Sequence, residues 1–300
     1  MIVSGRLGKG PCESRQEEDV MKVLLCLLLL VPAAHCMQKQ EREEIKRTLK
    51  FQEPGPSARL LVDNVYGSII VVGYDGPDVQ LVAVRTTKAD SDRKMEEARE
   101  DVTLDINEQR DRIEVVVDAP WRSRWGGMHD RGYRYYGYTV SYDFELKVPR
   151  TTGLYLRTVN DGDIEVTDVE GEFEVGNVNG DVTMTNVAGS GKVGTVNGSL
   201  EVSFRKNPSN NCSFRTVNGK VDVTFQESLS ADLVLRTFNG KAYTDFDFAP
   251  ADRPKLRKEE KRGRKLFRLG DDYTVRVGEG GPQLAFDTLN GNINIKKYSN

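Results

Sequence analysis

The sequence predicts an all-β protein, a parallel β-solenoid of about seven rungs with one short helix and two irregular excursions. Three observations support this fold class. A glycine-centred turn recurs along the chain, columns of similar residues precede each glycine, and apolar residues alternate with polar ones after it. Internal repeats of about 20 residues are typical of stacked architectures, so we interpret the 300-residue chain as a repeat protein.

Asparagine precedes the turn glycine in every unit of the regular array, with Asp161 inserted in the first unit. The turn pairs are Asn160 and Gly162, Asn179 and Gly180, Asn197 and Gly198, Asn218 and Gly219, Asn239 and Gly240, and Asn290 and Gly291. Both residue types tolerate positive φ, which predicts a sharp corner at the same point of each unit. An antiparallel meander and a parallel solenoid both use such corners.

The repeated corner asparagine favours the solenoid. In a meander nothing requires the same asparagine at every second turn. Parallel rungs place like residues about 4.8 Å apart, so their amides can hydrogen-bond into a ladder. Because unpaired buried amides cost free energy, we expect a structural ladder, stacked inward or edge-on, rather than an outward-facing binding surface.

Further columns accompany the corner. Threonine or asparagine stands two residues before the corner asparagine, and an apolar residue stands directly before it. These two columns are Thr158, Asn177, Thr195, Thr216, Thr237 and Thr288, and Val159, Val178, Val196, Val217, Phe238 and Leu289. Apolar residues two and four positions after the glycine predict a strand with one buried face, and Ala242 and Thr244 mark one irregular unit. A degenerate first unit has Tyr66 in place of the corner asparagine.

The regular solenoid spans residues 151–300, with an insertion at 249–282, and follows an N-terminal β portion at 37–150. In the N-terminal portion we expect a strand at 45–52 and a helix at 92–99 capped by Asp90 and Ser91. Further strands are predicted at 102–106, 112–117 and 140–148. The insertion is predicted to hold a hairpin of strands 265–269 and 273–277, followed by a turn at 278–281.

The beginning of the chain has the pattern of a secretory signal peptide. Residues 21–36 combine a basic start, a short apolar run and small residues, so cleavage is expected after Ala33 and export to the periplasm, the cell surface or the medium. Cys36 offers a lipid anchor as the alternative, and this is the one membrane attachment that the sequence predicts. Acidic residues before Met21 indicate that residues 1–20 are a mis-assigned upstream extension.

The Thr-Val-Asn-Gly-x-Ile-x-Val pattern behind a signal peptide resembles the bacterial putative-adhesin family, also called the toast-rack family of domains of unknown function. The resemblance covers roughly residues 45–300. It implies a parallel β-solenoid on or outside the cell envelope, with no established catalytic residues. The family has no functional residue that could be transferred to this chain.

The excursion at 119–138 is the candidate binding loop. It contains both tryptophans of the chain together with arginines and tyrosines, namely Trp121, Arg122, Arg124, Trp125, Arg131, Tyr133, Arg134, Tyr135 and Tyr136. Aromatic rings stack on sugar rings and arginines bind anionic groups, so the loop could bind an envelope glycan or an anionic polymer. The pattern favours the other interpretation, a flap that covers one end or face of the solenoid, because solenoid ends must be capped to hide their unpaired strands.

Composition excludes several other function classes. The net charge of −3 argues against nucleic acid. After removal of residues 1–36, His129 is the one histidine left, so no transition-metal cluster and no cofactor is expected. Cys212 is expected to be a small buried residue, and the basic segment 253–268 a solvated loop. No phosphate-binding loop or nucleophile elbow is present.

The sequence thus predicts an exported, non-catalytic β-repeat protein of the cell envelope, an adhesin or scaffold that binds glycan or another envelope component. Two alternatives stay open. One is a polysaccharide-active β-helix enzyme, which needs paired carboxylates, or carboxylates among basic residues, in a groove. The other is an accessory of envelope-stress signalling.

Overall fold

The computed structural model describes residues 38–53, 55, 57–122, 136–250, 256–261, 264–269 and 272–298. The chain divides into a unit of residues 1–37 and a unit of residues 38–300, and all described residues belong to the second unit. This part of the chain is mostly β, with one described helix and two large sheets. The prediction of a β-rich repeat fold is therefore confirmed.

The first sheet has ten strands in the order β1-β4-β7-β3-β9-β11-β13-β15-β23-β17. They are β1 (Lys39–Leu49), β4 (Val79–Ala89), β7 (Tyr138–Pro149), β3 (Ile69–Tyr74), β9 (Ile164–Thr167), β11 (Val182–Val187), β13 (Leu200–Phe204), β15 (Val221–Phe225), β23 (Ile293–Lys297) and β17 (Ala242–Thr244).

The second sheet has eleven strands in the order β18-β21-β16-β22-β14-β12-β10-β8-β2-β6-β5. They are β18 (Phe248–Pro250), β21 (Asp272–Val277), β16 (Ala231–Thr237), β22 (Gln283–Asn290), β14 (Cys212–Asn218), β12 (Gly191–Gly194), β10 (Phe173–Gly176), β8 (Gly153–Arg157), β2 (Arg59–Asp63), β6 (Arg112–Asp118) and β5 (Thr103–Glu108). Strands β19 (Leu256–Lys261) and β20 (Arg264–Leu269) form a separate two-stranded sheet.

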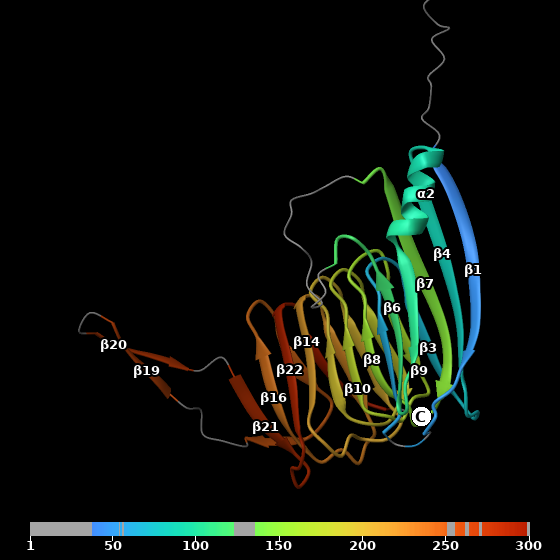
Figure 1. The fold of residues 1–300 in the computed structure, drawn as a ribbon. Coiled ribbons are helices and arrows are strands. Elements are labelled where there is room, and N and C mark those ends of the chain that lie inside the picture. The colour runs from blue at the N-terminus through green and yellow to red at the C-terminus, as the bar shows by residue number, and fades with distance from the viewer. Residues whose placement is uncertain are drawn as a thin grey trace, which may run out of the picture. The chain divides into compact units, whose positions relative to one another are not determined.

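Each repeat unit contributes one strand to each sheet, and equivalent strands of successive units pair in parallel. In the first sheet Ile164 pairs with Val182, and Val182 with Leu200. In the second sheet Leu154 pairs with Phe173. Figure 1 shows strands β8, β10, β14, β22 and β16 in this order across the second sheet. Parallel pairing in this register confirms the solenoid arrangement and rules out the meander for these units.

The order of the units in space differs from their order in the chain. Strands β22 and β23, which come last, lie between β14 and β16 in the second sheet and between β15 and β17 in the first. The unit with Asn290 is therefore internal, and the unit with Asn239 ends the first sheet. This explains the irregular residues Ala242 and Thr244, because β17 has one neighbouring strand among the described residues and neither side chain is buried.

Both sheets are mixed rather than purely parallel. Strands β1 and β4 pair antiparallel with each other, and β4 with β7. The predicted hairpin of 265–269 with 273–277 is wrong, because β20 pairs with β19 while β21 pairs antiparallel with β16 and β18. The strand expected at 45–52 starts earlier, as β1 at Lys39, since its exposed charged residues hide the alternation.

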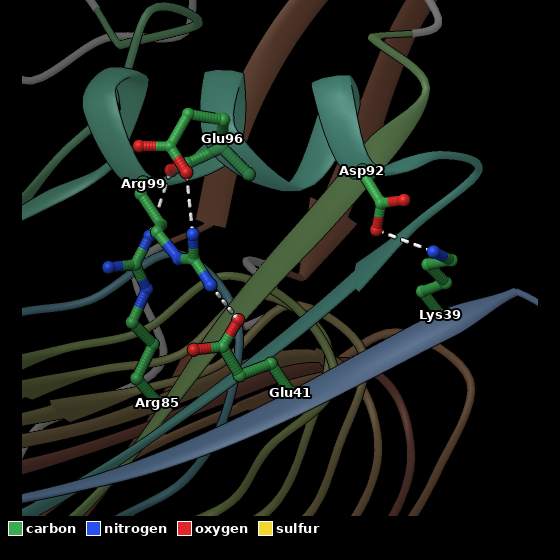
Figure 2. A network of polar contacts seen from close by, with 7 residues as sticks. Lys39, Glu41, Arg85, Asp92, Glu96 and Arg99 are labelled. Carbon is green, nitrogen blue, oxygen red and sulfur yellow. Dashed lines mark hydrogen bonds and ion pairs between the residues drawn. The ribbon is translucent and has the colours of Figure 1, made fainter.

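Helix α2 (Asp92–Asp101) lies against β4 and β7, and the cap at Ser91 is confirmed, because its side chain accepts a hydrogen bond from the Lys94 amide. Met95 and Ala98 form its buried face. On the exposed side, Arg99 pairs with Glu41 and Glu96, and Lys39 pairs with Asp92, which links the helix to β1 (Figure 2).

The core is one continuous cluster between the two sheets. The apolar positions two and four residues after the turn glycine are buried in it in every unit except that of Gly240, as the alternation predicts. Aromatic rings stack within it along the solenoid: Phe204 and Phe225 have ring centroids 5.0 Å apart, and Phe214 and Phe286 5.2 Å apart. The contact of Phe214 with Phe286 shows that β22 fills an internal position.

Candidate functional site

The corner asparagines form an uninterrupted ladder on the protein surface. From Asn179 onward, each side-chain Nδ2 donates a hydrogen bond of 2.7–2.8 Å to the Oδ1 of the asparagine on the neighbouring rung. The spatial sequence is Asn160, Asn179, Asn197, Asn218, Asn290 and Asn239. The predicted ladder is thus present and stacked edge-on, but it is exposed rather than turned inward. An amide has two N–H groups and two acceptor lone pairs, so each internal asparagine keeps one of each for water or a ligand.

The threonine column beside the ladder is a second, buried network. The Oγ1 atoms of Thr158, Thr195, Thr216, Thr288 and Thr237 each donate to the carbonyl oxygen of a turn glycine on the neighbouring rung, at 2.8–3.0 Å. Asn177 does the same through Nδ2 at 2.9 Å. These bonds satisfy the corner carbonyls that the turns leave without a strand partner.

The expected reason for the turn glycines is wrong. None of the six has φ in the left-handed region, which the described chain uses instead at positions such as Gly67 and Gly189. A Cβ on Gly198 would lie 2.1 Å from the carbonyl oxygen of Gly180, and the other turn glycines meet a neighbouring backbone as closely. Glycine is therefore required because successive corners pack backbone against backbone.

The apolar column directly before the asparagines faces outward. Val159, Val178 and Val217 are half-buried, whereas Val196, Leu289 and Phe238 are 38%, 46% and 74% exposed. The sequence contained the signal for this orientation, because the threonine or asparagine before each of these residues points inward and successive strand residues face opposite sides. We call the surface formed by the asparagine ladder and this apolar column the ladder face.

A gap in the side chains of the second sheet adjoins the ladder face. Arg157, Gly176, Gly194 and Arg215 pair in register on four adjacent strands. A Cβ on Gly176 would meet no atom within 4 Å, and one on Gly194 would meet only the Arg215 carbonyl oxygen at 3.3 Å. Packing does not explain these two glycines, which are the last residues of β10 and β12, and a glycine in a strand can mark a place where another molecule approaches the backbone.

The candidate binding loop is described at its two ends. Trp121 packs between Tyr66, Tyr136 and Tyr138, with ring centroids 5.3–6.4 Å apart. Tyr66 bridges to Asn160, so this aromatic cluster begins where the asparagine ladder begins. The residues Arg124, Trp125, Arg131, Tyr133, Arg134 and Tyr135 lie outside the described residues, as does His129.

Arg122 has a structural task. Its guanidinium forms an ion pair with the Asp63 carboxylate and donates to the carbonyl oxygens of Asp63 and Val117. Because the Arg122 side chain is 13% exposed, it fixes the loop on β2 and β6 instead of facing a ligand. The described ends of the loop therefore pack against the solenoid, as expected of a flap.

The described residues hold no cluster of three or more metal-ligating His, Cys, Asp or Glu side chains. Cys212 is buried as predicted, and burial raises the pKa of its thiol, which keeps it protonated. The side chains of the basic segment 253–268 lie outside the description.

A shallow pocket of about 600 Å³ combines carboxylates with arginine, the pattern that the enzyme alternative needs. It is lined by Asp75, Arg150 and Glu170, with Tyr74 and two prolines around them. Arg150 pairs with Asp75 at 2.8 Å, and Glu170 pairs with Arg205. Each of these two carboxylates is thus engaged in an ion pair with an arginine.

Within the described residues, no helix has the length and apolar character needed to span a membrane. Residues 154–296 match a family model described as Toastrack DUF4097. No curated protein matches the chain.

Several solved structures resemble this fold at low identity. A putative cell adhesion protein from Clostridium sporogenes is 11% identical with a TM-score of 0.40, over 87% of this chain and 100% of that chain. A putative adhesin from Bacteroides fragilis is 13% identical with a TM-score of 0.38, over 85% and 97%. A putative lipid binding protein from Parabacteroides distasonis is 10% identical with a TM-score of 0.29, over 87% and 97%. These likenesses are too distant to carry an argument about function.

Proposed function

The repeat region of this chain, residues 154–296, belongs to the toast-rack family, and on that premise we propose that the protein is an exported, non-catalytic binding module of the cell envelope. Its ligand is an extended glycan, and its binding surface is the ladder face with the adjoining gap. The single observation that carries this proposal is the exposed asparagine ladder beside two glycines that packing does not require.

The chemistry of the ladder face suits a sugar chain. Sugar hydroxyls both donate and accept hydrogen bonds, and each internal asparagine has one free N–H and one free lone pair. The C–H faces of sugar rings are apolar and suit the half-buried side chain of Val178 and the exposed side chain of Val196. Arg157 and Arg215, at the two ends of the gap, suit acidic substituents or ring faces.

The geometry suits a chain that runs along the solenoid axis. The amides repeat at the strand spacing of about 4.8 Å, so the same polar contact recurs on every rung. The gap spans the strands from Arg157 to Arg215, three such spacings or about 14 Å. An extended polymer with repeating hydroxyls meets this pattern better than a compact ligand does.

The decisive experiment fills the gap without disturbing the fold. The full chain is tested for binding to insoluble peptidoglycan and to a panel of neutral and acidic polysaccharides. In the Gly176→Val variant the new side chain occupies open space, so the affinity for any bound glycan should fall at least about tenfold, or ~1.4 kcal/mol. Gly55→Val is the matched control. Its new side chain also points into open space, but it lies in a loop that is distant in sequence from Gly176.

Two outcomes would contradict the proposal. Failure of the full chain to bind any member of the panel would remove glycan as the ligand class. Equal binding by Gly176→Val and the wild type would show that the ligand sits elsewhere, with the 123–135 segment as the next region to delete.

The export part of the proposal rests on residues 21–36. We expect the mass of the secreted protein to correspond to a chain that begins at Ala34. A heavier species that loses its added mass on Cys36→Ser would instead identify a lipid anchor. A product that retains residues 21–33 would contradict export through this segment.

A further inference from the structure

Strand β17 ends the first sheet with one edge free among the described residues. Its other edge pairs in parallel with β23, where the Ile293 amide donates to the Lys241 carbonyl and the Asp245 amide donates to the Ile295 carbonyl. Backbone groups of a strand alternate between its two edges. The N–H and C=O groups of Ala242 and Thr244 therefore face away from the protein.

Exposed aromatic side chains lie in β17 and before and after it in the sequence. Phe238 precedes β17 and is 74% exposed, Tyr243 at its centre is 52% exposed, and Phe248 after it is 57% exposed. Six of the seven large exposed hydrophobic residues of the described chain lie between positions 238 and 298. The exposed apolar side chains are thus concentrated in the C-terminal part of the described chain, which includes β17.

The two sheets end differently at this side. In the second sheet, strands β21 and β18 run antiparallel beyond the last repeat strand, β16, and cap it. The first sheet has no described counterpart of this cap beyond β17. A solenoid edge without a cap is open to pairing with another strand.

We propose that β17 pairs antiparallel with β17 of a second copy of this chain, around a two-fold axis at Tyr243. In this register Ala242 lies opposite Thr244 of the second copy, and these residues carry the outward N–H and C=O groups that antiparallel pairing needs. The result is an isologous dimer in which the two ten-stranded sheets become one continuous sheet.

The charged residues that flank β17 favour a second copy of the chain as partner and favour the antiparallel register centred on Tyr243. Lys241 and Asp245 flank the strand, both are exposed, and they face the same side as Tyr243. Around an axis at Tyr243, Lys241 of each copy lies opposite Asp245 of the other, and the two tyrosines meet at the centre. A parallel copy would instead set lysine beside lysine, so the strand is complementary to itself in the antiparallel direction alone.

Charge reversal tests the register. Sedimentation velocity of the full chain from about 1 μM to about 1 mM should show a reversible monomer–dimer equilibrium. Lys241→Glu and Asp245→Lys should each weaken dimerisation about tenfold or more, because each opposes like charges twice in the dimer. The double variant should restore the wild-type dissociation constant to within about threefold. The proposal would be overturned by a protein that stays monomeric over the whole concentration range. It would also be overturned by a dimer whose dissociation constant is the same in the wild type and the single variants.

A cross-link tests the axis without dependence on affinity. Directly opposed residues of a non-hydrogen-bonded antiparallel pair have Cα atoms about 4.5 Å apart, which a disulfide can bridge. Tyr243→Cys should therefore form a covalent dimer under mild oxidation, above the level seen for the wild type and for Tyr298→Cys, an exposed tyrosine outside β17. Equal cross-linking of Tyr243→Cys and Tyr298→Cys would contradict the two-fold axis, as would none at all.

Discussion

At the corner between the two sheets, three residues of each unit make contacts from rung to rung. The threonine hydroxyl binds the glycine carbonyl of the neighbouring rung, the glycine makes room for that carbonyl, and the asparagine amide binds the next amide. All three contacts need a neighbour in register, so the motif stabilises stacking rather than an isolated turn.

The close steric contacts of the turn glycines predict that any substitution with a side chain strongly lowers the free energy of unfolding. The sequence alone predicts that Gly198→Val destabilises by at least about 1 kcal/mol through positive φ. Because φ is not left-handed there and a Cβ would lie 2.1 Å from the Gly180 oxygen, we expect about 1–3 kcal/mol from overpacking. Urea unfolding measures this cost.

Gly198→Asn distinguishes the two causes. Asparagine tolerates positive φ but clashes as any Cβ does, so it should cost as much as Gly198→Ala. A nearly neutral asparagine variant would restore the conformational explanation. Gly176→Val is the control, and its free energy of unfolding should stay unchanged or rise by up to ~1 kcal/mol, because glycine inside a strand is unfavourable.

We expect the contribution of Asp222 to the free energy of unfolding to be lost at acid pH. Burial raises its pKa, but hydrogen bonds from Asn294 and Lys220 and the charge of Lys296 outweigh burial, so the pKa is lowered overall. A carboxyl with a lowered folded pKa contributes stability above the unfolded value of about 3.9, and this is lost as pH falls through the folded pKa. The stability difference between the wild type and Asp222→Asn should therefore shrink below about pH 4. A difference that stays constant down to pH 2 would contradict this assignment.

At the scale of elements, helix α2 depends on its cap and on the strands beneath it. Ion pairs link it to β1, yet most of these side chains are exposed, and exposed pairs contribute at most about 1 kcal/mol each. The buried contacts of Met95 and Ala98 with β4 and β7 hold the helix more firmly.

The cap of α2 gives a local prediction. Ser91→Ala removes the acceptor for the Lys94 amide and should cost about 1 kcal/mol. Hydrogen exchange should show faster opening of residues 92–95, with the solenoid strands unaffected. Ser57→Ala, an exposed serine in a loop, should leave both unchanged.

At the scale of the whole molecule, the last strands of the chain lie inside the stack. Phe286 of β22 packs on Phe214 of β14 and on Phe225 of β15, so the C-terminal segment separates two other units. Loss of β22 and β23 would therefore remove a layer from inside the stack, instead of shortening the stack at one end.

Truncation after residue 250 should therefore prevent stable folding. It removes more than the roughly 3–5 kcal/mol typical of a single buried Phe→Ala change, against a usual total stability of about 5–15 kcal/mol. Circular dichroism and limited proteolysis would show the loss. As a control, replacing residues 253–272 with an Asn-Gly turn joins β18 to β21 in their antiparallel register, from Pro250 and Val275 onward, and should preserve the fold. A folded truncated protein would contradict the internal position of β22.

By itself, the sequence determined the repeat, the buried apolar columns, the capped helix and the existence of an amide ladder. These follow from local alternation and from like residues that stack on like, which any neighbouring rung satisfies. The sequence did not determine the spatial order of the rungs, because all units present equivalent strand edges. The insertion at 249–282 is also long enough to let the chain return between two earlier units.

Tertiary structure alone decided why the turn glycines are glycines, whether the ladder is exposed and which described strand ends the first sheet. The sequence of one unit does not reveal how closely the backbone of the next rung approaches. The prediction of a positive φ at Gly198 was therefore wrong, and the close approach of the Gly180 carbonyl is the reason for the glycine. The exposure of Asn197, the empty space at Gly176 and the free edge of β17 depend on which strands are neighbours, and the packing of the whole chain sets that.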